Sequence, residues 1–186
     1  MKRVAVFGNA GSGKSTLARR LAEITGLPLF PLDLIEYRVG GEAVPREEYR
    51  EKHAELLKRD EWIIDGFGDV KSAWERFAAA DTLIHVDPSL PVCAWRVTKR
   101  FAKGMFVLPE GWPAGSPMWR STLASYRVLG LCDKHLTPRY RKLIADEASR
   151  KRTYGLKSTA EVRSFLESVE RERSHALPER GPLARP

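Results

Sequence analysis

Residues 4–16 read VAVFGNAGSGKST, and this stretch decides how the chain folds. Its first four residues form a short apolar run rich in β-branched side chains, which predicts a buried strand that ends at Gly8. From Lys14 onward the apolar residues recur at helical spacing, and Gly26 marks the end of that helix. The apolar positions of the predicted helix are Leu17, Ala18, Leu21 and Ala22. A strand, a glycine-rich turn and a helix therefore follow one another directly.

The turn at residues 8–15 matches the pattern G-x-x-x-x-G-K-[ST] in full. Glycines let the backbone point several N–H groups inward as an anion site, and the N-terminus of the following helix adds positive charge there. Lys14 is expected to reach the β- and γ-phosphates, and the Ser15 hydroxyl to ligate Mg²⁺. The turn thus predicts binding of a nucleoside triphosphate, ATP with Mg²⁺. The predicted nucleotide-binding residues are Gly8, Asn9, Ala10, Gly11, Ser12, Gly13, Lys14, Ser15 and Thr16.

Further strands and helices alternate along the rest of the chain. The predicted strands span 27–32, 62–64, 82–86 and 153–156, and the predicted helices span 45–58, 69–79, 88–103, 118–131, 138–150 and a last one from 158. This alternation predicts an α/β fold with a five-stranded parallel sheet between two layers of helices, the three-layer P-loop NTPase architecture. We expect one domain over 1–172, with a Gly- and Pro-rich lid insertion at about 104–117 and a polar, disordered tail at 173–186.

Composition narrows the class of protein. The 186 residues are 42% hydrophobic and 30% charged, which is typical of one soluble domain. Because no apolar run approaches the length of a membrane span, and the first apolar stretch is too short for a signal peptide, we expect a cytoplasmic protein without a membrane partner. Cys93 and Cys132 lie in no pairing motif, so reduced thiols are expected. The net charge of +8 favours polyanionic partners, which include nucleotides and nucleic acid.

Several charged residues outside the turn are candidates for chemistry. Asp33 and Asp65 end the second and third predicted strands, at the edge of a parallel sheet where ligands bind. Asp33 either orients the hydroxyl of an acceptor, or acts as its base, or is an ordinary loop aspartate. Arg96 and Arg100 share one face of a helix that leads into the predicted lid, where they either clamp a transferring phosphate or form a solvated basic face. Arg127 is a further candidate for this clamp.

Four segments together resemble the adenylate kinase-like superfamily over residues 1–170. They are residues 62–68 (WIIDGFG), residues 86–89 (VDPS) with Arg96 and Arg100 after them, residues 32–34 (LDL) and residues 154–158 (YGLKS). The last two resemble a subgroup known as adenylate kinase-related or DNA topology modulation (FlaR-like) proteins. The resemblance implies that Asp65 orders a Mg²⁺-bound water beside Ser15, and that Arg96 and Arg100 act on the transferring phosphate.

The chain also departs from the adenylate kinase pattern on the acceptor side. Gly68 stands where adenylate kinases have proline, and Asp69 stands where they have an arginine that binds substrate. The sequence therefore predicts a small ATP-dependent kinase whose acceptor is a nucleotide or another small molecule, without specifying AMP. The alternative is an ATP-binding regulator associated with nucleic acid, which the net charge and the FlaR-like resemblance motivate but no nucleic-acid-binding motif supports.

Overall fold

The computed structural model describes residues 1–38, 42–104 and 126–176. The strands are β1 (Arg3–Gly8), β2 (Leu29–Pro31), β3 (Trp62–Asp65), β4 (Thr82–Val86) and β5 (Arg152–Leu156). The helices are α1 (Lys14–Thr25), α2 (Asp33–Glu36), α3 (Arg46–Leu57), α4 (Val70–Ala79), α5 (Leu90–Gly104), α7 (Thr137–Glu147) and α8 (Thr159–Ala176), with a π-helix η1 (Cys132–Leu136) before α7. Residues 126–131 are also helical and run into η1.

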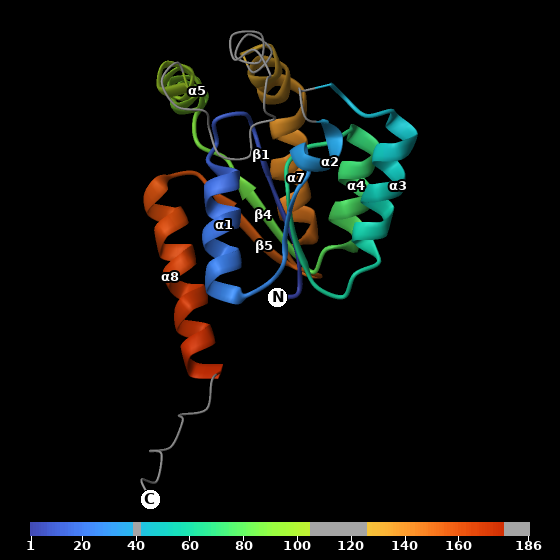
Figure 1. Ribbon diagram of the computed structural model, residues 1–186. Coiled ribbons are helices and arrows are strands. Elements are labelled where there is room, and N and C mark those ends of the chain that lie inside the picture. The colour runs from blue at the N-terminus through green and yellow to red at the C-terminus, as the bar shows by residue number, and fades with distance from the viewer. Residues whose placement is uncertain (39–41, 105–125, 177–186) are drawn as a thin grey trace, which may run out of the picture.

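The strands form one parallel sheet in the order β2-β3-β1-β4-β5. Figure 1 shows α1 and α8 side by side on one face of the sheet, with α3, α4 and α7 on the other. This arrangement confirms the predicted α/β fold with a five-stranded parallel sheet. Because all strands run the same way, the loops that follow β1, β2, β3 and β4 converge at one edge, where ligands bind in such folds.

Alternate residues of β1 build the two halves of the core. Val4 and Val6 face α1 and α8, where they pack with Leu17 and Phe165 in one buried cluster. Ala5 and Phe7 face the other way and join a second cluster, which includes Phe77 of α4 and Tyr140 of α7. Both faces of the strand are buried, which is why this segment reads as a continuous apolar run in the sequence.

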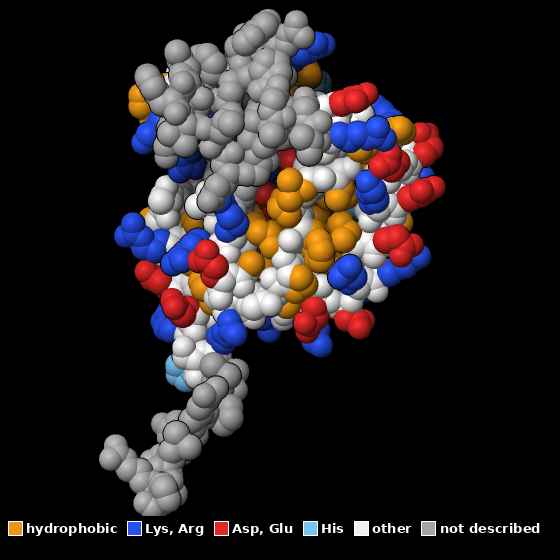
Figure 2. All heavy atoms as spheres, in the orientation of Figure 1, with side chains coloured by type: hydrophobic (Ala, Val, Ile, Leu, Met, Phe, Trp, Pro, Cys, Tyr) orange, Lys and Arg blue, Asp and Glu red, His pale blue; other side chains and the backbone are white. Residues whose placement is uncertain are grey.

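The strand β2 forms one edge of the sheet. Its three residues are half-buried, and the guanidinium of Arg59 lies 5.1 Å from the centroid of the Phe30 ring. Figure 2 shows hydrophobic side chains gathered between α1 and α3, where this edge runs. A short edge strand with a cation over its aromatic ring limits pairing with other chains.

The structure departs from the predicted elements around the second and the later helices. Asp33 begins the short helix α2 instead of only ending a strand. The separate helices predicted at 118–131 and 138–150 are, from residue 126 on, one continuous helical run in which η1 precedes α7. Pro138 lies in the first turn of α7; it cannot donate to a carbonyl one turn back, and the wider π turn accommodates it without ending the helix.

The predicted lid and the predicted tail can be compared with the observed ends of α5 and α8. α5 reaches Gly104, and most of the predicted lid at 104–117 lies outside the described residues. α8 continues to Ala176, past the point at which the polar tail was expected to begin. Among the residues that the structure describes, no helix is both long and apolar enough to cross a bilayer.

Candidate nucleotide-binding site

The glycine-rich turn follows β1 and leads directly into α1. Gly11 and Gly13 adopt φ angles of +72° and +96°, a region that other residues rarely occupy. A Cβ atom at Gly11 would overlap the main-chain oxygen of Cys93 in α5. The first bond of α1 runs from the Leu17 N–H to the Gly13 carbonyl, at 3.1 Å. The glycines are therefore required both by the backbone conformation and by the close approach of α5.

Two side chains hold the turn in place from within the protein. The Nδ2 atom of Asn9 donates to the main-chain oxygen of Leu129 at 2.9 Å, and its Oδ1 accepts from the N–H of Ala10 at 2.7 Å. Arg96 donates through Nη1 to the main-chain oxygen of Ser12 at 2.7 Å. The Ala10 and Ser12 N–H groups are bonded to Asn9 within the turn, so an anion would be bound by the other N–H groups of the turn.

Asp65 lies beside the start of α1 with its side chain buried. It is 5% exposed, and its Oδ1 atom has no hydrogen-bond partner within the described part of the chain. Burial raises the pKa of this carboxyl, while the Lys14 ammonium and a hydrogen bond with Ser15 lower it. The structure therefore brings Lys14, Ser15 and Asp65 together, as predicted for a site that holds phosphate and Mg²⁺.

The donor set fits a magnesium ion. Mg²⁺ prefers oxygen ligands and retains several of its own waters, so one hydroxyl and one nearby carboxylate suffice on the protein side. The unpartnered Oδ1 of Asp65 is a buried acceptor that a metal-bound water would satisfy. The hydroxyl of Ser12 is likewise buried without a partner in the described residues, at the floor of the same turn.

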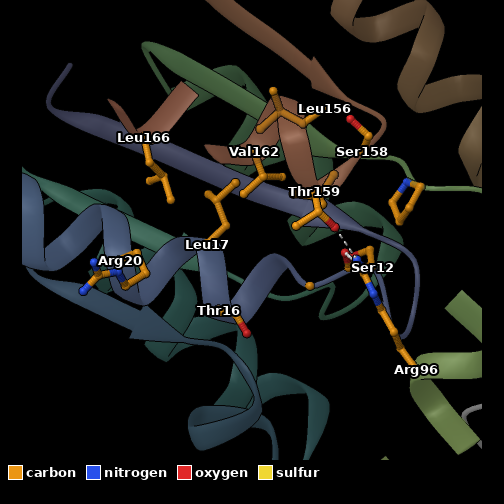
Figure 3. Close-up of a pocket in the computed structure, with 13 residues that line it drawn as sticks. Ser12, Thr16, Leu17, Arg20, Arg96, Leu156, Ser158, Thr159, Val162 and Leu166 are labelled. Atoms are coloured by element: carbon orange, nitrogen blue, oxygen red, sulfur yellow. Dashed lines mark hydrogen bonds between the residues drawn. The ribbon is translucent and has the colours of Figure 1, made fainter. Parts of the chain in front are cut away.

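A pocket of about 250 Å³ opens next to the turn, between α1 and α8. Figure 3 shows Leu17, Val162 and Leu156 around it, with Ser12 and Thr159 at one end. Arg96 closes that end, because its Nη2 donates to the Thr159 hydroxyl at 3.0 Å while its Nη1 holds Ser12. The pocket has apolar walls and a polar, cationic mouth beside the phosphate-binding turn.

Asp33 lies at the same edge of the sheet as Asp65. It is exposed at the start of α2, and the preceding residue, Leu32, donates its N–H to the Asp65 carbonyl at 2.8 Å. The two carboxylates are close enough to interact, since Asp33 contributes to raising the pKa of Asp65. Asp33 is thus near Asp65 at this edge, and its predicted role toward an acceptor stays a prediction.

The remaining predicted arginines are exposed. Arg100 is exposed one helical turn beyond Arg96 on α5, and Arg127 is exposed two residues before Leu129. Arg96 is half-buried and holds the turn and Thr159, so it already has a structural task in addition to the predicted contact with phosphate. The proposed clamp of Arg96, Arg100 and Arg127 stays a prediction.

Two buried charges have surroundings that the sequence did not reveal: Asp87 could be interpreted from the sequence as a helix N-cap before Pro88, and Arg76 was not singled out. Asp87 at the end of β4 is 9% exposed and forms a two-bond ion pair with Arg141, at 2.7 and 3.2 Å. Arg76 of α4 is completely buried. A signal for Arg76 was present, because it falls at helical spacing with Ala73, Phe77 and Ala80, on the apolar stripe of its helix.

On the acceptor side, Asp69 has a structural role. Its side chain accepts the Ser72 N–H at 2.9 Å and caps α4, and the Ser72 hydroxyl completes a capping box. Its second oxygen accepts from Arg50 at 3.3 Å. The residue that replaces the adenylate kinase arginine thus serves to begin a helix, and it places no cation at this position.

The chain is similar to known kinases in sequence and in fold. No family model matches the chain. The chain is 33% identical to the cytidylate kinase of Pyrobaculum aerophilum over 114 residues, which span 55% of this chain and 62% of that protein. The match therefore covers less than two thirds of the relative. It supports a small P-loop kinase, and assignment to the FlaR-like subgroup stays a prediction.

Two solved structures share the fold. A shikimate kinase from Acinetobacter baumannii aligns with a TM-score of 0.57 at 16% identity, over 96% of each chain. A shikimate kinase from Bacteroides thetaiotaomicron aligns with a TM-score of 0.56 at 18% identity, over 93% of this chain and 98% of the other. At these identities the likeness establishes the architecture, the P-loop kinase fold, and no particular substrate.

Proposed function

We propose that this chain is an ATP-dependent phosphotransferase that moves the γ-phosphate of ATP to a small acceptor molecule. The observation that carries the proposal is the meeting of Lys14, Ser15 and Asp65, whose Oδ1 atom has no partner among the described residues, at one end of an intact phosphate-binding turn. The kinase relative and the shared fold of the shikimate kinases support the same class of reaction.

Each part of the site has a task in this proposal. The N–H groups of residues 8–16 and the Lys14 ammonium bind the phosphates. Ser15 and Asp65 hold Mg²⁺, which neutralises charge on the phosphate oxygens when it is bound. The pocket between α1 and α8 receives the base of the nucleotide, with Arg96 at its mouth. Asp33 orients the acceptor oxygen from the end of β2.

The acceptor belongs to one of two chemical classes. The relative's name favours a nucleoside monophosphate such as CMP, and the fold is equally suited to a hydroxyl-bearing metabolite. Asp69 lies where a monophosphate kinase of the adenylate type would present an arginine, and this favours an acceptor with less negative charge at that position. Both classes are therefore included in the test.

The nucleic-acid alternative has less support. Although the net charge is +8, Figure 2 shows Lys and Arg side chains interspersed with Asp and Glu on the face in view, and they do not gather into one basic surface. Binding of DNA with a steep salt dependence, without acceptor-dependent turnover, would favour that alternative.

The decisive experiment measures ADP release from Mg-ATP in a coupled assay. The acceptor panel contains CMP, dCMP, UMP, AMP and GMP, together with shikimate and simple sugars, and the control variant is Lys14→Ala. We expect at least one acceptor to raise ADP release about tenfold or more above water-dependent hydrolysis, because a kinase site favours transfer over hydrolysis. Equal rates with and without every acceptor would contradict the proposal.

A further inference from the structure

Arg76 is an unusual buried residue that the proposed site does not use directly. It is 0% exposed and forms no salt bridge within the described residues, although the Asp65 carboxylate is near enough to act on its charge. Its guanidinium carbon lies 5.4 Å from the centroid of the Phe77 ring. Burial lowers the pKa of this guanidinium, since the charged form loses its hydration. The Tyr49 hydroxyl and the Asp65 carboxylate favour the charged form and offset part of this effect. A buried guanidinium without a salt-bridge partner is still costly for a fold, so its presence calls for an explanation.

The hydrogen bonds of Arg76 go to one short loop. Its Nη2 atom donates to the main-chain oxygen of Gly66 at 2.9 Å and to that of Phe67 at 3.4 Å. Its Nε and Nη1 atoms have no hydrogen-bond partner in the described part of the chain. The loop is the one that directly follows Asp65 at the ligand-binding edge of the sheet. Arg76 therefore draws two successive carbonyls of this loop inward, toward the core.

Peptide geometry determines the direction of the N–H groups on the opposite side of the loop. The chain has no cis peptide bond, and in a trans peptide the C=O and N–H groups point in opposite directions. When the carbonyls of Gly66 and Phe67 turn toward Arg76, the N–H groups of Phe67 and Gly68 turn away from it. Neither N–H has a hydrogen-bond partner among the described residues.

The neighbours of the loop lie on the acceptor side. A Cβ atom built at Gly66 would lie 3.0 Å from the Cβ of Leu32, the residue immediately before Asp33. The hydroxyl of Tyr49 packs against Gly68 so closely that a Cβ there would overlap it, and this hydroxyl also bonds to Ser72 at 3.1 Å. The loop is thus held by Tyr49 of α3 and Arg76 of α4, and it packs against Leu32, the residue before Asp33.

We propose that Arg76 is a positioning residue for the acceptor: it fixes the Gly66–Gly68 loop so that the N–H groups of Phe67 and Gly68 bind an oxygen of the acceptor. This inference rests on the proposed function, and it names backbone donors in place of the missing arginine at position 69. The buried charge is retained because no neutral side chain of this size would hold two carbonyls in this direction.

The test compares Arg76→Met and Arg76→Lys with Lys71→Met, a matched control. Lys71 is exposed on the same helix, where its ammonium lies 3.9 Å from Glu75. Four quantities are measured in each variant: the unfolding midpoint, the Kd of Mg-ATP, the KM of the acceptor, and hydrogen–deuterium exchange of residues 66–69. The acceptor is CMP, or the panel member that releases most ADP if CMP releases none.

We expect Arg76→Met to keep the Kd of Mg-ATP within about twofold of the wild type. The acceptor KM should rise about tenfold or more, because the loop would lose contacts that bind the acceptor equally in the ground state and the transition state. Its unfolding midpoint should stay close to that of the wild type, because removal of a buried charge stabilises the fold while loss of the donor to the Gly66 and Phe67 carbonyls destabilises it. Exchange at 66–69 should be faster. Arg76→Lys should lie between these values, and Lys71→Met should match the wild type.

Other results would overturn the inference. A wild-type acceptor KM and wild-type exchange in Arg76→Met would show that the loop does not depend on this side chain. A lower midpoint with parallel losses of ATP and acceptor binding would show a merely structural role. If the wild type releases no acceptor-dependent ADP, the proposed function fails and the acceptor role with it, while the exchange data still decide whether Arg76 holds the loop.

Discussion

The side-chain amide of Asn9 donates a 2.9 Å hydrogen bond to the main-chain oxygen of Leu129, a residue 120 positions later in the chain. Both residues are buried. The bond joins the second residue of the phosphate-binding turn to the helical run at 126–131. The main-chain oxygen of Asn9 separately accepts from the Ser12 N–H at 3.2 Å. The shape of the turn is therefore partly set by a helix that lies far away in the sequence.

Replacement of Asn9 should weaken both the fold and the site. In Asn9→Ala the buried oxygen of Leu129 loses its donor, which costs about 1–3 kcal/mol. We expect a lower unfolding midpoint by calorimetry and a weaker Kd for Mg-ATP by titration. Ser174→Ala, which removes an exposed hydroxyl from α8, is the control and should change neither. An unchanged midpoint in Asn9→Ala would show that the Asn9–Leu129 bond contributes nothing.

Removal of the Lys14 ammonium should abolish nucleotide binding. In Lys14→Ala the turn keeps its N–H groups but loses the cation that is expected to reach the β- and γ-phosphates. Isothermal titration with Mg-ATP should show no heat, and ADP release should fall to background. Lys142→Ala is the control, since Lys142 is exposed and pairs with Asp146 on α7. Wild-type binding by Lys14→Ala would contradict the proposed site.

Asp65→Asn should separate stability from activity. Because burial raises the pKa of Asp65 in the folded state, its ionised form costs stability as pH rises above the ordinary aspartate range. The amide removes that cost, so the midpoint should rise at pH 7 and match the wild type near pH 3. Mg²⁺-dependent ADP release should fall by about a hundredfold, since a carboxylate near the metal is lost. A variant that keeps full activity would exclude Asp65 from the metal site.

Arg96→Met tests the mouth of the pocket. The substitution removes the bonds to Ser12 and Thr159 but keeps much of the apolar length of the side chain. We expect the Kd of Mg-ATP to weaken about tenfold, which corresponds to roughly 1.4 kcal/mol for the loss of a charge-assisted contact. Arg163→Met, at an exposed position of α8, should bind as the wild type does. Fluorescence titration with a labelled ATP analogue measures both variants.

His85 should make the fold sensitive to acid. Burial lowers its pKa from 6.5 to about 4, with Asp87 acting against this shift and Arg141 adding to it. In the unfolded chain the ring takes up a proton near pH 6.5, but in the folded chain only near pH 4. Stability is therefore complete above pH 6.5 and falls as pH drops toward 4, by at most about 3 kcal/mol.

His85→Phe should flatten this part of the pH profile. The ring of His85 stacks on Phe7 at 5.3 Å between centroids and contacts Tyr140 edge-on, so a phenyl ring suits the same space. Chemical denaturation between pH 4 and 7 measures the profile. His175→Phe, on the exposed end of α8, is the control and should retain the wild-type slope. An unchanged slope in His85→Phe would assign the acid sensitivity to other groups, of which buried His53 is the first to examine.

Local patterns predicted the elements of the fold well. The apolar run before Gly8, the helical spacing after Lys14 and the Ser158–Glu161 pair at the start of α8 each depend on neighbours within a few residues. Hydrogen bonds within a turn join residues only a few positions apart, and the spacing of buried residues in a helix or strand also repeats every few positions. For the same reason α2 was missed, because a four-residue helix has too few positions to show a period.

The sequence by itself determined the phosphate-binding turn, the order of strands and helices, and the set of charged residues at the ends of β2 and β3. Only the tertiary structure decided that Arg96 holds Ser12 and Thr159, that Asn9 reaches Leu129, and that Arg76 is buried beneath the loop after Asp65. These contacts join segments that are distant in the chain or depend on how a helix rotates against the sheet. Their partners are chosen by packing of the whole core, which no local period encodes.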